Sequence, residues 1–244
     1  MLPRMHLINL DRSTSRLRHF ERLNDQLTNV VRFSAVDGAT RSREELIRNG
    51  IITPDCPYSD GTLGCALSHI ELWQKAVREK TPITVFEDDI VVADEFENIA
   101  TRLIQTVEPD WDFILWGYCY ERPILKIWVD YGFTKAVTQF FGHSTQSIRS
   151  YKGNRVLHRL LNAFGTQAYS VSPRGAERLL QICLPLRLRG IPFAQPGVGF
   201  RDEGIDGPAN LAYSAMSSYV CVPPLAVQGA PEDVPSDRIN LDRR

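Results

Sequence analysis

The sequence of 244 residues has little of what marks several large protein classes. No apolar run is long enough to span a bilayer, and no internal repeat is present. Lysine and arginine total 28 against 29 aspartates and glutamates, so no basic excess points to nucleic acid as the main partner. The chain enters a strand pattern almost at once, so we expect no signal peptide.

The cysteines are few and unpatterned. Five are present, an odd number, and none forms a C-x-x-C pair. This argues against a disulfide framework and against a structural zinc site. We therefore expect reduced thiols in a cytoplasmic protein.

What the chain does have is the composition of a globular protein, with 43% hydrophobic and 23% charged residues. Short apolar runs alternate with stretches of helical periodicity, and this order predicts an α/β domain with a mostly parallel central sheet covered by helices. Residues 118–164 lack a clear period and predict irregular hairpins and loops, residues 197–207 predict a loop, and residues 231–244 predict a polar tail. The expected strands are 5–10, 30–33, 83–86, 111–117, 168–171 and 218–222, and the expected helices include 13–27, 63–80, 94–107 and 172–183.

The most informative feature is the acidic triplet Glu87-Asp88-Asp89, directly after the apolar run 83–86. Strand ends in open α/β sheets are where ligands collect, and clustered carboxylates suit Mg²⁺ or Mn²⁺. In extended backbone Glu87 and Asp89 point the same way and Asp88 points oppositely, although a turn can break this alternation. The alternative is an acidic turn that simply faces solvent.

Several short segments together carry a resemblance that spans nearly the whole chain in order. They are Ile8-Asn9-Leu10-Asp11-Arg12 with Arg16, Ala35-Val36-Asp37-Gly38, Gly61-Thr62-Leu63-Gly64-Cys65-Ala66-Leu67-Ser68-His69 with Trp73, Phe86-Glu87-Asp88-Asp89, Gly165-Thr166-Gln167-Ala168-Tyr169 with Ser172, then Asp206, and Pro223-Pro224-Leu225-Ala226-Val227-Gln228. In these the sequence resembles glycosyltransferase family 25, the bacterial lipooligosaccharide sugar transferases with relatives that galactosylate collagen.

The resemblance implies a GT-A fold, a nucleotide-sugar donor, a divalent metal and an inverting transfer. It implies one glycosyltransferase domain over 1–244, with a nucleotide-sugar and metal half (1–117), an acceptor-side half (118–230) and the tail (231–244). Asp89 is expected as the direct metal ligand, with Glu87 at the metal and Asp88 at the metal shell or the donor. The other expected donor-binding residues are Asn9, Arg16, Asp37, Ser68, His69 and Gln228.

Each of these assignments has a structural alternative. Arg16 can lie on a solvated helix face, and Asp37 can form an Asx turn. A histidine such as His69, which shares a helix face with Cys65 and Trp73, is more often a core residue than a ligand. Ser68 and His69 are given no chemical step.

An inverting transfer also needs a carboxylate as general base near the acceptor hydroxyl. The acids of the 197–207 loop are Asp202, Glu203 and Asp206. Asp206 matches the family's single aspartate after the 172–183 helix and is the leading base, with Glu203 in reserve. The alternative for each is an exposed loop acid.

These expectations combine into a metal-dependent transferase that moves a hexose, with galactose as the first choice, from a UDP-sugar to a lipooligosaccharide, lipopolysaccharide or similar acceptor. The alternatives are a non-catalytic nucleotide-sugar-binding scaffold with the same fold and, less well matched, a metal phosphohydrolase. Four cations, Arg149, Lys152, Arg155 and Arg159, are expected to meet the acceptor or the inner face of the membrane, although a solvated loop explains them as well.

Overall fold

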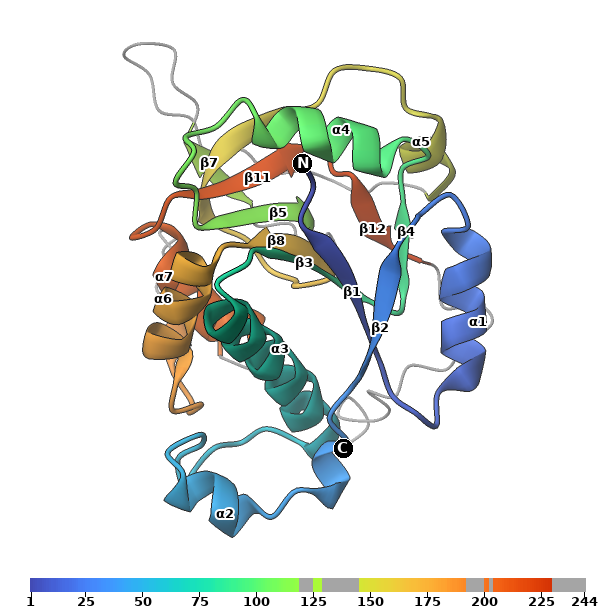
Figure 1. The fold of residues 1–244 in the computed structure, drawn as a ribbon. Helices are drawn as coiled ribbons and strands as arrows, with labels where there is room; N and C mark the ends of the chain where they lie inside the picture. The colour runs from blue at the N-terminus through green and yellow to red at the C-terminus, as the bar shows by residue number, and fades with distance from the viewer. Residues whose placement is uncertain (119–124, 129–144, 192–199, 202–203, 230–244) are drawn as a thin grey trace.

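The protein is built around one mixed eight-stranded sheet, described here from a computed structural model of residues 1–118, 125–128, 145–191, 200–201 and 204–229 (Figure 1). The strand order is β2-β1-β3-β8-β5-β11-β7-β6. The bounds are β1 Arg4–Asn9, β2 Val30–Ser34, β3 Ile83–Glu87, β5 Phe113–Gly117, β6 Lys126–Trp128, β7 Val156–Asn162, β8 Ala168–Val171 and β11 Ser218–Val222. Two further pairs lie outside this sheet: β4 (Ile90–Val92) with β12 (Ala226–Gln228), and β9 (Gly190–Ile191) with β10 (Phe200–Arg201).

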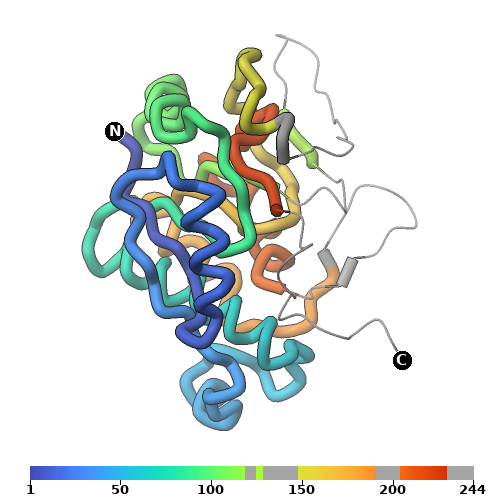
Figure 2. The backbone as a smooth tube through the Cα atoms, turned by 90° about the vertical axis from the view of Figure 1, so that its right-hand side faces the viewer, coloured from blue at the N-terminus to red at the C-terminus, as the bar shows by residue number. Residues whose placement is uncertain are grey.

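Helices cover both faces of the sheet (Figure 1). On one face lie α3 (Asp60–Glu79), α6 (Pro173–Cys183) and α7 (Asp206–Tyr213), and on the other lie α1 (Thr14–Leu23) and α4 (Phe96–Ile104). The short η1 (Gly38–Thr40), α2 (Arg43–Arg48) and α5 (Thr145–Ser150) complete the described helices. In Figures 1 and 2 α2 lies at the lower end of the molecule, beyond the sheet. Among the described residues, no helix combines the length and apolar character that crossing a membrane requires.

The alternation of side chains along the strands divides the core into two layers. In β5, Phe113 and Leu115 pack in the layer under α3, α6 and α7. Ile114 and Trp116 of the same strand pack in the layer under α1 and α4. All four side chains are buried, so β5 is covered on both faces and its sequence is apolar throughout.

The expected α/β architecture is confirmed, and the sheet is mixed in one informative way. Six of its eight strands run in one direction, and β8 and β7 run against them. β8 lies antiparallel between β3 and β5, so the segment that leads into β8 arrives at the edge where β3 ends.

Three local expectations were wrong. Residues 118–164 are not wholly irregular, because Val156–Asn162 forms β7 and pairs antiparallel with β11. The expected loop 197–207 ends early, since Asp206 is the first residue of α7. Asp94 is not the cap of α4, whose N-cap is Glu95 without a side-chain hydrogen bond. The expected tail 231–244 lies outside the described residues.

Helix α3 lies directly on the backbone that follows β2. A Cβ on Gly64 would stand 2.5 Å from the Val36 carbonyl oxygen and 2.7 Å from the Gly38 nitrogen. One turn further on, the Ser68 hydroxyl accepts from the Val36 amide at 2.9 Å and donates to the Gly64 carbonyl at 2.7 Å. The helix thus holds residues 36–38 in place.

This close approach predicts that Gly64→Ala destabilises the fold. Alanine favours a helix over glycine by about 1 kcal/mol, but its methyl group meets rigid backbone here, so we expect a net loss of about 1–3 kcal/mol in the free energy of unfolding. Urea denaturation checks this. The matched control is Gly190→Ala, where no atom of the described residues lies within 4 Å of the added carbon. Equal stability of the two variants would contradict the prediction.

Candidate functional site

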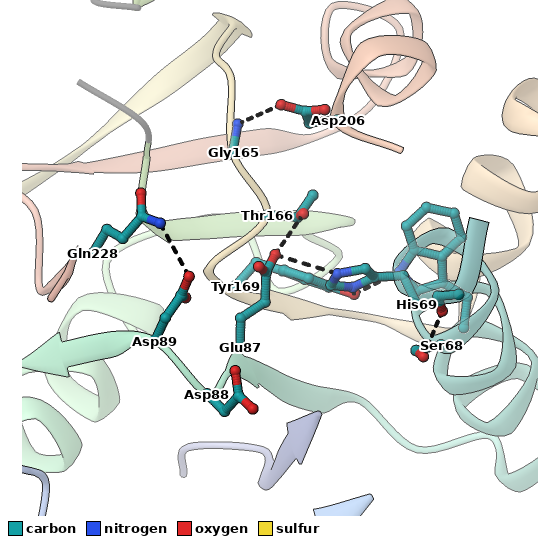
Figure 3. Close-up of polar contacts among 12 residues, drawn as sticks. Ser68, His69, Glu87, Asp88, Asp89, Gly165, Thr166, Tyr169, Asp206 and Gln228 are labelled. Atoms are coloured by element: carbon teal, nitrogen blue, oxygen red, sulfur yellow. Dashed lines mark hydrogen bonds and ion pairs between the residues drawn. The ribbon is translucent and has the colours of Figure 1, made fainter. Parts of the chain in front are cut away.

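The acidic triplet occupies the tight turn between β3 and β4 (Figure 3). The turn breaks the alternation of extended backbone, so the three carboxylates point to three different partners. Asp88 faces β1 and α1, Asp89 faces β12, and Glu87 faces α3 and β8. Extended backbone would have grouped Glu87 with Asp89 against Asp88, and the structure shows the other alternative, in which the turn separates all three.

Asp88 is buried and fixes the turn to the first strand and helix. Asn9, the last residue of β1, donates through Nδ2 to Asp88 Oδ2 at 2.7 Å. Arg16 of α1 donates through Nε to Asp88 Oδ1 at 2.8 Å, and its Nη2 also pairs with this oxygen. The side chain of Arg16 is only 16% exposed, so it is a carboxylate partner rather than a solvated helix residue.

Asp89 keeps one oxygen available. Its Oδ2 accepts from Gln228 Nε2 at 3.0 Å and lies 3.6 Å from Arg16 Nη2, whereas its Oδ1 is buried and has no hydrogen-bond partner among the described residues. Burial and the charge of Glu87 raise the pKa of Asp89 to about 6, against the opposing effect of Arg16. A divalent cation would supply the missing partner and favour the ionised carboxylate. The residues of this turn therefore fit a metal.

Glu87 is held from two sides (Figure 3). Its Oε1 accepts from the Thr166 hydroxyl at 2.9 Å and lies 3.4 Å from Nε2 of the fully buried His69. Potential ligand atoms of Cys65, His69 and Glu87 all lie within 4.8 Å of one another. The Cys65 thiol is a softer potential donor than the Glu87 carboxylate beside it.

His69 belongs to a buried polar cluster in the core. Its Nδ1 is 2.9 Å from the Tyr169 hydroxyl, which also accepts from Trp73 Nε1 at 2.9 Å. Burial by itself lowers the pKa of His69, but the polar groups of Tyr169 and Cys65 outweigh burial, so the pKa of the imidazole is raised. His69 is thus both a core histidine and a neighbour of the acidic triplet.

Two expected donor-binding residues have local structural contacts. Ser68 is fully buried, and its hydroxyl is used by Val36 and Gly64. Asp37 caps η1 by accepting from the Ala39 amide at 3.2 Å, which is the Asx-type alternative, and it also pairs with Arg12. Contact of either residue with a donor stays a prediction.

Asp206 lies across from the triplet (Figure 3). Its Oδ2 accepts from the Gly165 amide at 3.0 Å, and the next residue, Thr166, donates to Glu87. The reserve bases Glu203 and Asp202 lie outside the described residues. Sequence reasoning found Gly165 and Thr166 as part of a motif and gave them no role, because hydrogen bonds that join residues 41 and 79 positions apart leave no local pattern.

The four expected surface cations have different surroundings, and Arg159 donates to the Met216 carbonyl at 2.9 Å. Arg155 is buried, and it donates to the backbone oxygens of Pro224, Tyr151 and Ile148. Arg149 lies 4.0 Å from Asp94, and Lys152 lies 3.4 Å from Glu95. The expected surface role of Arg155 was wrong, and membrane contact stays a prediction.

Comparison with known proteins supplies the family. The model of a family described as "Glycosyltransferase family 25 (LPS biosynthesis protein)" matches residues 2–193. The chain belongs to glycosyltransferase family 25. Of the candidate site residues, Asp206, Gln228 and the reserve bases Asp202 and Glu203 lie beyond the matched range.

Curated relatives carry the family name. A "Glycosyltransferase 25 family member" of Drosophila melanogaster is 33% identical over 128 residues, 48% of this chain and 21% of that protein. One of Anopheles gambiae is 28% identical over 199 residues, 74% of this chain and 29% of that protein. A mouse protein named "Inactive glycosyltransferase 25 family member 3" is 31% identical over 146 residues, 52% of this chain and 24% of that protein. The chain spans about a fifth to a third of the length of these relatives.

The pairing of Arg16 with Asp88 predicts a stability difference between two arginines. Arg16→Met removes the charged partner of a buried carboxylate, so we expect a loss of about 1–3 kcal/mol in the free energy of unfolding. Arg12→Met is the matched control, since Arg12 is 57% exposed in its pair with Asp37 and such pairs contribute about 0–1 kcal/mol. Urea denaturation of both variants decides. Equal losses of unfolding free energy would mean that the Arg16–Asp88 pair contributes no more to stability than the exposed Arg12–Asp37 pair.

Proposed function

We propose that the chain is a metal-dependent inverting glycosyltransferase that moves a hexose from a UDP-sugar to a glycan acceptor. The observation that carries this proposal is Asp89, in the turn after β3, whose buried Oδ1 has no hydrogen-bond partner in the part of the chain that the structure describes. Family membership supports the transferase class. The family description names lipopolysaccharide biosynthesis, which supports a lipooligosaccharide or lipopolysaccharide acceptor. UDP-galactose is the first donor to test, as the resemblance implies.

On the donor side, Asp89 would hold Mn²⁺ or Mg²⁺. A bound cation neutralises negative charge that grows on the diphosphate leaving group. Asn9 and Arg16 hold Asp88 and so fix the turn that presents Asp89. Gln228 orients Asp89 through Oδ2 and leaves Oδ1 for the cation.

On the acceptor side, Asp206 is the proposed general base. In a single displacement the acceptor oxygen attacks the anomeric carbon as the bond to the phosphate oxygen breaks, and UDP leaves with the bonding electrons. The proton of the acceptor hydroxyl passes to a carboxylate within hydrogen-bond reach. Asp206 uses Oδ2 to accept from Gly165, and it lies across the Gly165–Thr166 backbone from the triplet (Figure 3).

The alternative is a nucleotide-sugar-binding protein without turnover, and the name of the mouse relative gives it substance. The presence of both Asp89 and Asp206 favours an enzyme. UDP release from UDP-galactose in the presence of Mn²⁺, with water as the acceptor, separates the two functions, because a binding protein retains the nucleotide sugar without cleaving it.

The metal proposal predicts that Asp89→Ala abolishes UDP release while the protein stays folded. The reason is the loss of Asp89 Oδ1, a carboxylate oxygen without a hydrogen-bond partner among the described residues, which would hold the cation. Turnover of the unaltered protein should vanish in excess EDTA and return with Mn²⁺ or Mg²⁺. Asp25→Ala, which removes an exposed acid after α1, is the control and should keep full activity. Full turnover in EDTA, or in Asp89→Ala, would refute metal dependence.

The base proposal predicts that Asp206→Asn lowers kcat by roughly 10²–10⁴, the usual share of general base catalysis. The amide oxygen of asparagine can still accept from Gly165, so the fold should hold. Affinity for UDP with Mn²⁺, measured by calorimetry, should change little because the expected cation ligand is a different residue. An unchanged rate would move the search to Glu203 or Asp202, and a loss of UDP binding would place Asp206 on the donor side.

A further inference from the structure

Residues 163–167, called here the 163–167 segment, connect β7 to β8 and lie between the start of α7 and the end of β3. At the α7 end, Asn210 accepts from the Ala163 amide at 2.9 Å and donates to the Ala163 carbonyl at 2.7 Å. Asp206 accepts from the Gly165 amide at 3.0 Å. The Asn210 side chain also donates to the Asp206 carbonyl at 2.8 Å, so the start of α7 and this segment form one hydrogen-bonded unit.

At its other end the same segment holds Glu87. The Thr166 hydroxyl donates to Glu87 Oε1 at 2.9 Å, and the Glu87 amide donates to the Gln167 carbonyl at 2.9 Å. Thr166 is 5% exposed, so water does not readily replace its hydroxyl. Two neighbouring residues, Gly165 and Thr166, therefore link the proposed base to the acidic triplet (Figure 3).

The link is stiff on both sides. Gly165 has a φ of 92°, a conformation that residues with a side chain rarely adopt, and it is buried. Behind Glu87, His69 is held by Tyr169, whose hydroxyl is also bonded by Trp73. Glu87 thus contacts the fixed His69 on one side and Thr166 on the other.

We infer that Thr166 is a positioning residue that sets the placement of the acidic triplet relative to Asp206, and hence of donor relative to base. This inference rests on the proposed function. A misplacement of about 1 Å between reacting groups can cost on the order of 10²-fold in rate. Loss of the hydroxyl should therefore lower the rate of the chemical step more than the affinity for the donor.

The test is Thr166→Val, which keeps the shape and removes the hydroxyl. UDP release from UDP-galactose with Mn²⁺ gives kcat and KM. We expect kcat to fall by roughly 10–100-fold, KM to change by less than about threefold because Asp89 and Gln228 are untouched, and Thr166→Ser to restore most of the rate. Should Thr166→Val fail to fold, Thr166→Ala carries the same measurement.

A double variant separates positioning from simple destabilisation. If Thr166 acts by placing donor against base, Thr166→Val should cost little further once Asp206→Asn has removed the base, so the two effects should be far from additive. The matched control is Thr84→Val, which removes a buried hydroxyl of β3 that bonds Ser170 of β8 and the Pro3 carbonyl. It should lower thermal stability and leave kcat unchanged.

The outcomes are distinct. Absence of UDP release from the unaltered protein overturns the proposed function and this inference with it. Release by the unaltered protein together with an unchanged kcat in Thr166→Val overturns the inference alone. The inference is also overturned if Thr166→Ser does not restore the kcat that Thr166→Val loses. It is overturned as well if the fall in kcat of the double variant equals the product of the falls in the two single variants.

Discussion

The site depends on the mutual repulsion of three consecutive carboxylates and on the contacts by which the fold offsets this repulsion. Left to themselves, adjacent anions in a half-buried turn would push the turn apart. The structure gives each a different counterpart: Arg16 for Asp88, Gln228 for Asp89, and Thr166 with His69 for Glu87. These counterparts come from α1, β12, α3 and the residues that lead into β8. The shape of the turn therefore depends on the whole domain.

The direction of β8 explains how the two halves of the site meet. An antiparallel strand between β3 and β5 brings its leading residues to the edge where β3 ends. A parallel strand would deliver them to the opposite edge. The single reversal in this part of the sheet therefore places the Gly165 amide and the Thr166 hydroxyl next to Asp206 and Glu87.

The sequence predicted the elements whose signals are local. Ser172 caps α6 by accepting from the Gly175 amide, with Pro173 in the first turn, as the pattern indicated. The apolar run before the triplet is β3. The sequence pattern did not predict β7, because His158 and Arg159 interrupt its alternation of apolar and polar residues. Its pairing with β11 also joins residues some 60 positions apart. The direction of β8 could not be predicted, because the sequence pattern of a short buried strand is the same for a parallel and an antiparallel strand.

For the site, sequence reasoning identified the acids but not their partners. Asn9, Arg16, Asp88, Asp89 and Gln228 were expected together, and the structure does bring them together. Ser68 was expected at the donor, yet its hydroxyl bonds backbone on either side of it in the core. A match to a family motif identifies a residue as part of a shared pattern. It does not tell whether that residue contacts a ligand or packs a helix.

The bond between Gln228 and Asp89 joins residues 139 positions apart, and the Gly229 amide adds a second link to the Asp89 carbonyl at 2.7 Å. Contacts of such long sequence separation form late, because loop-closure entropy opposes them until most of the chain is ordered. The acidic turn can thus acquire its final shape only after β12 has docked beside β4. During synthesis on the ribosome, the first 200 residues would carry every acid of the triplet and still lack a finished site.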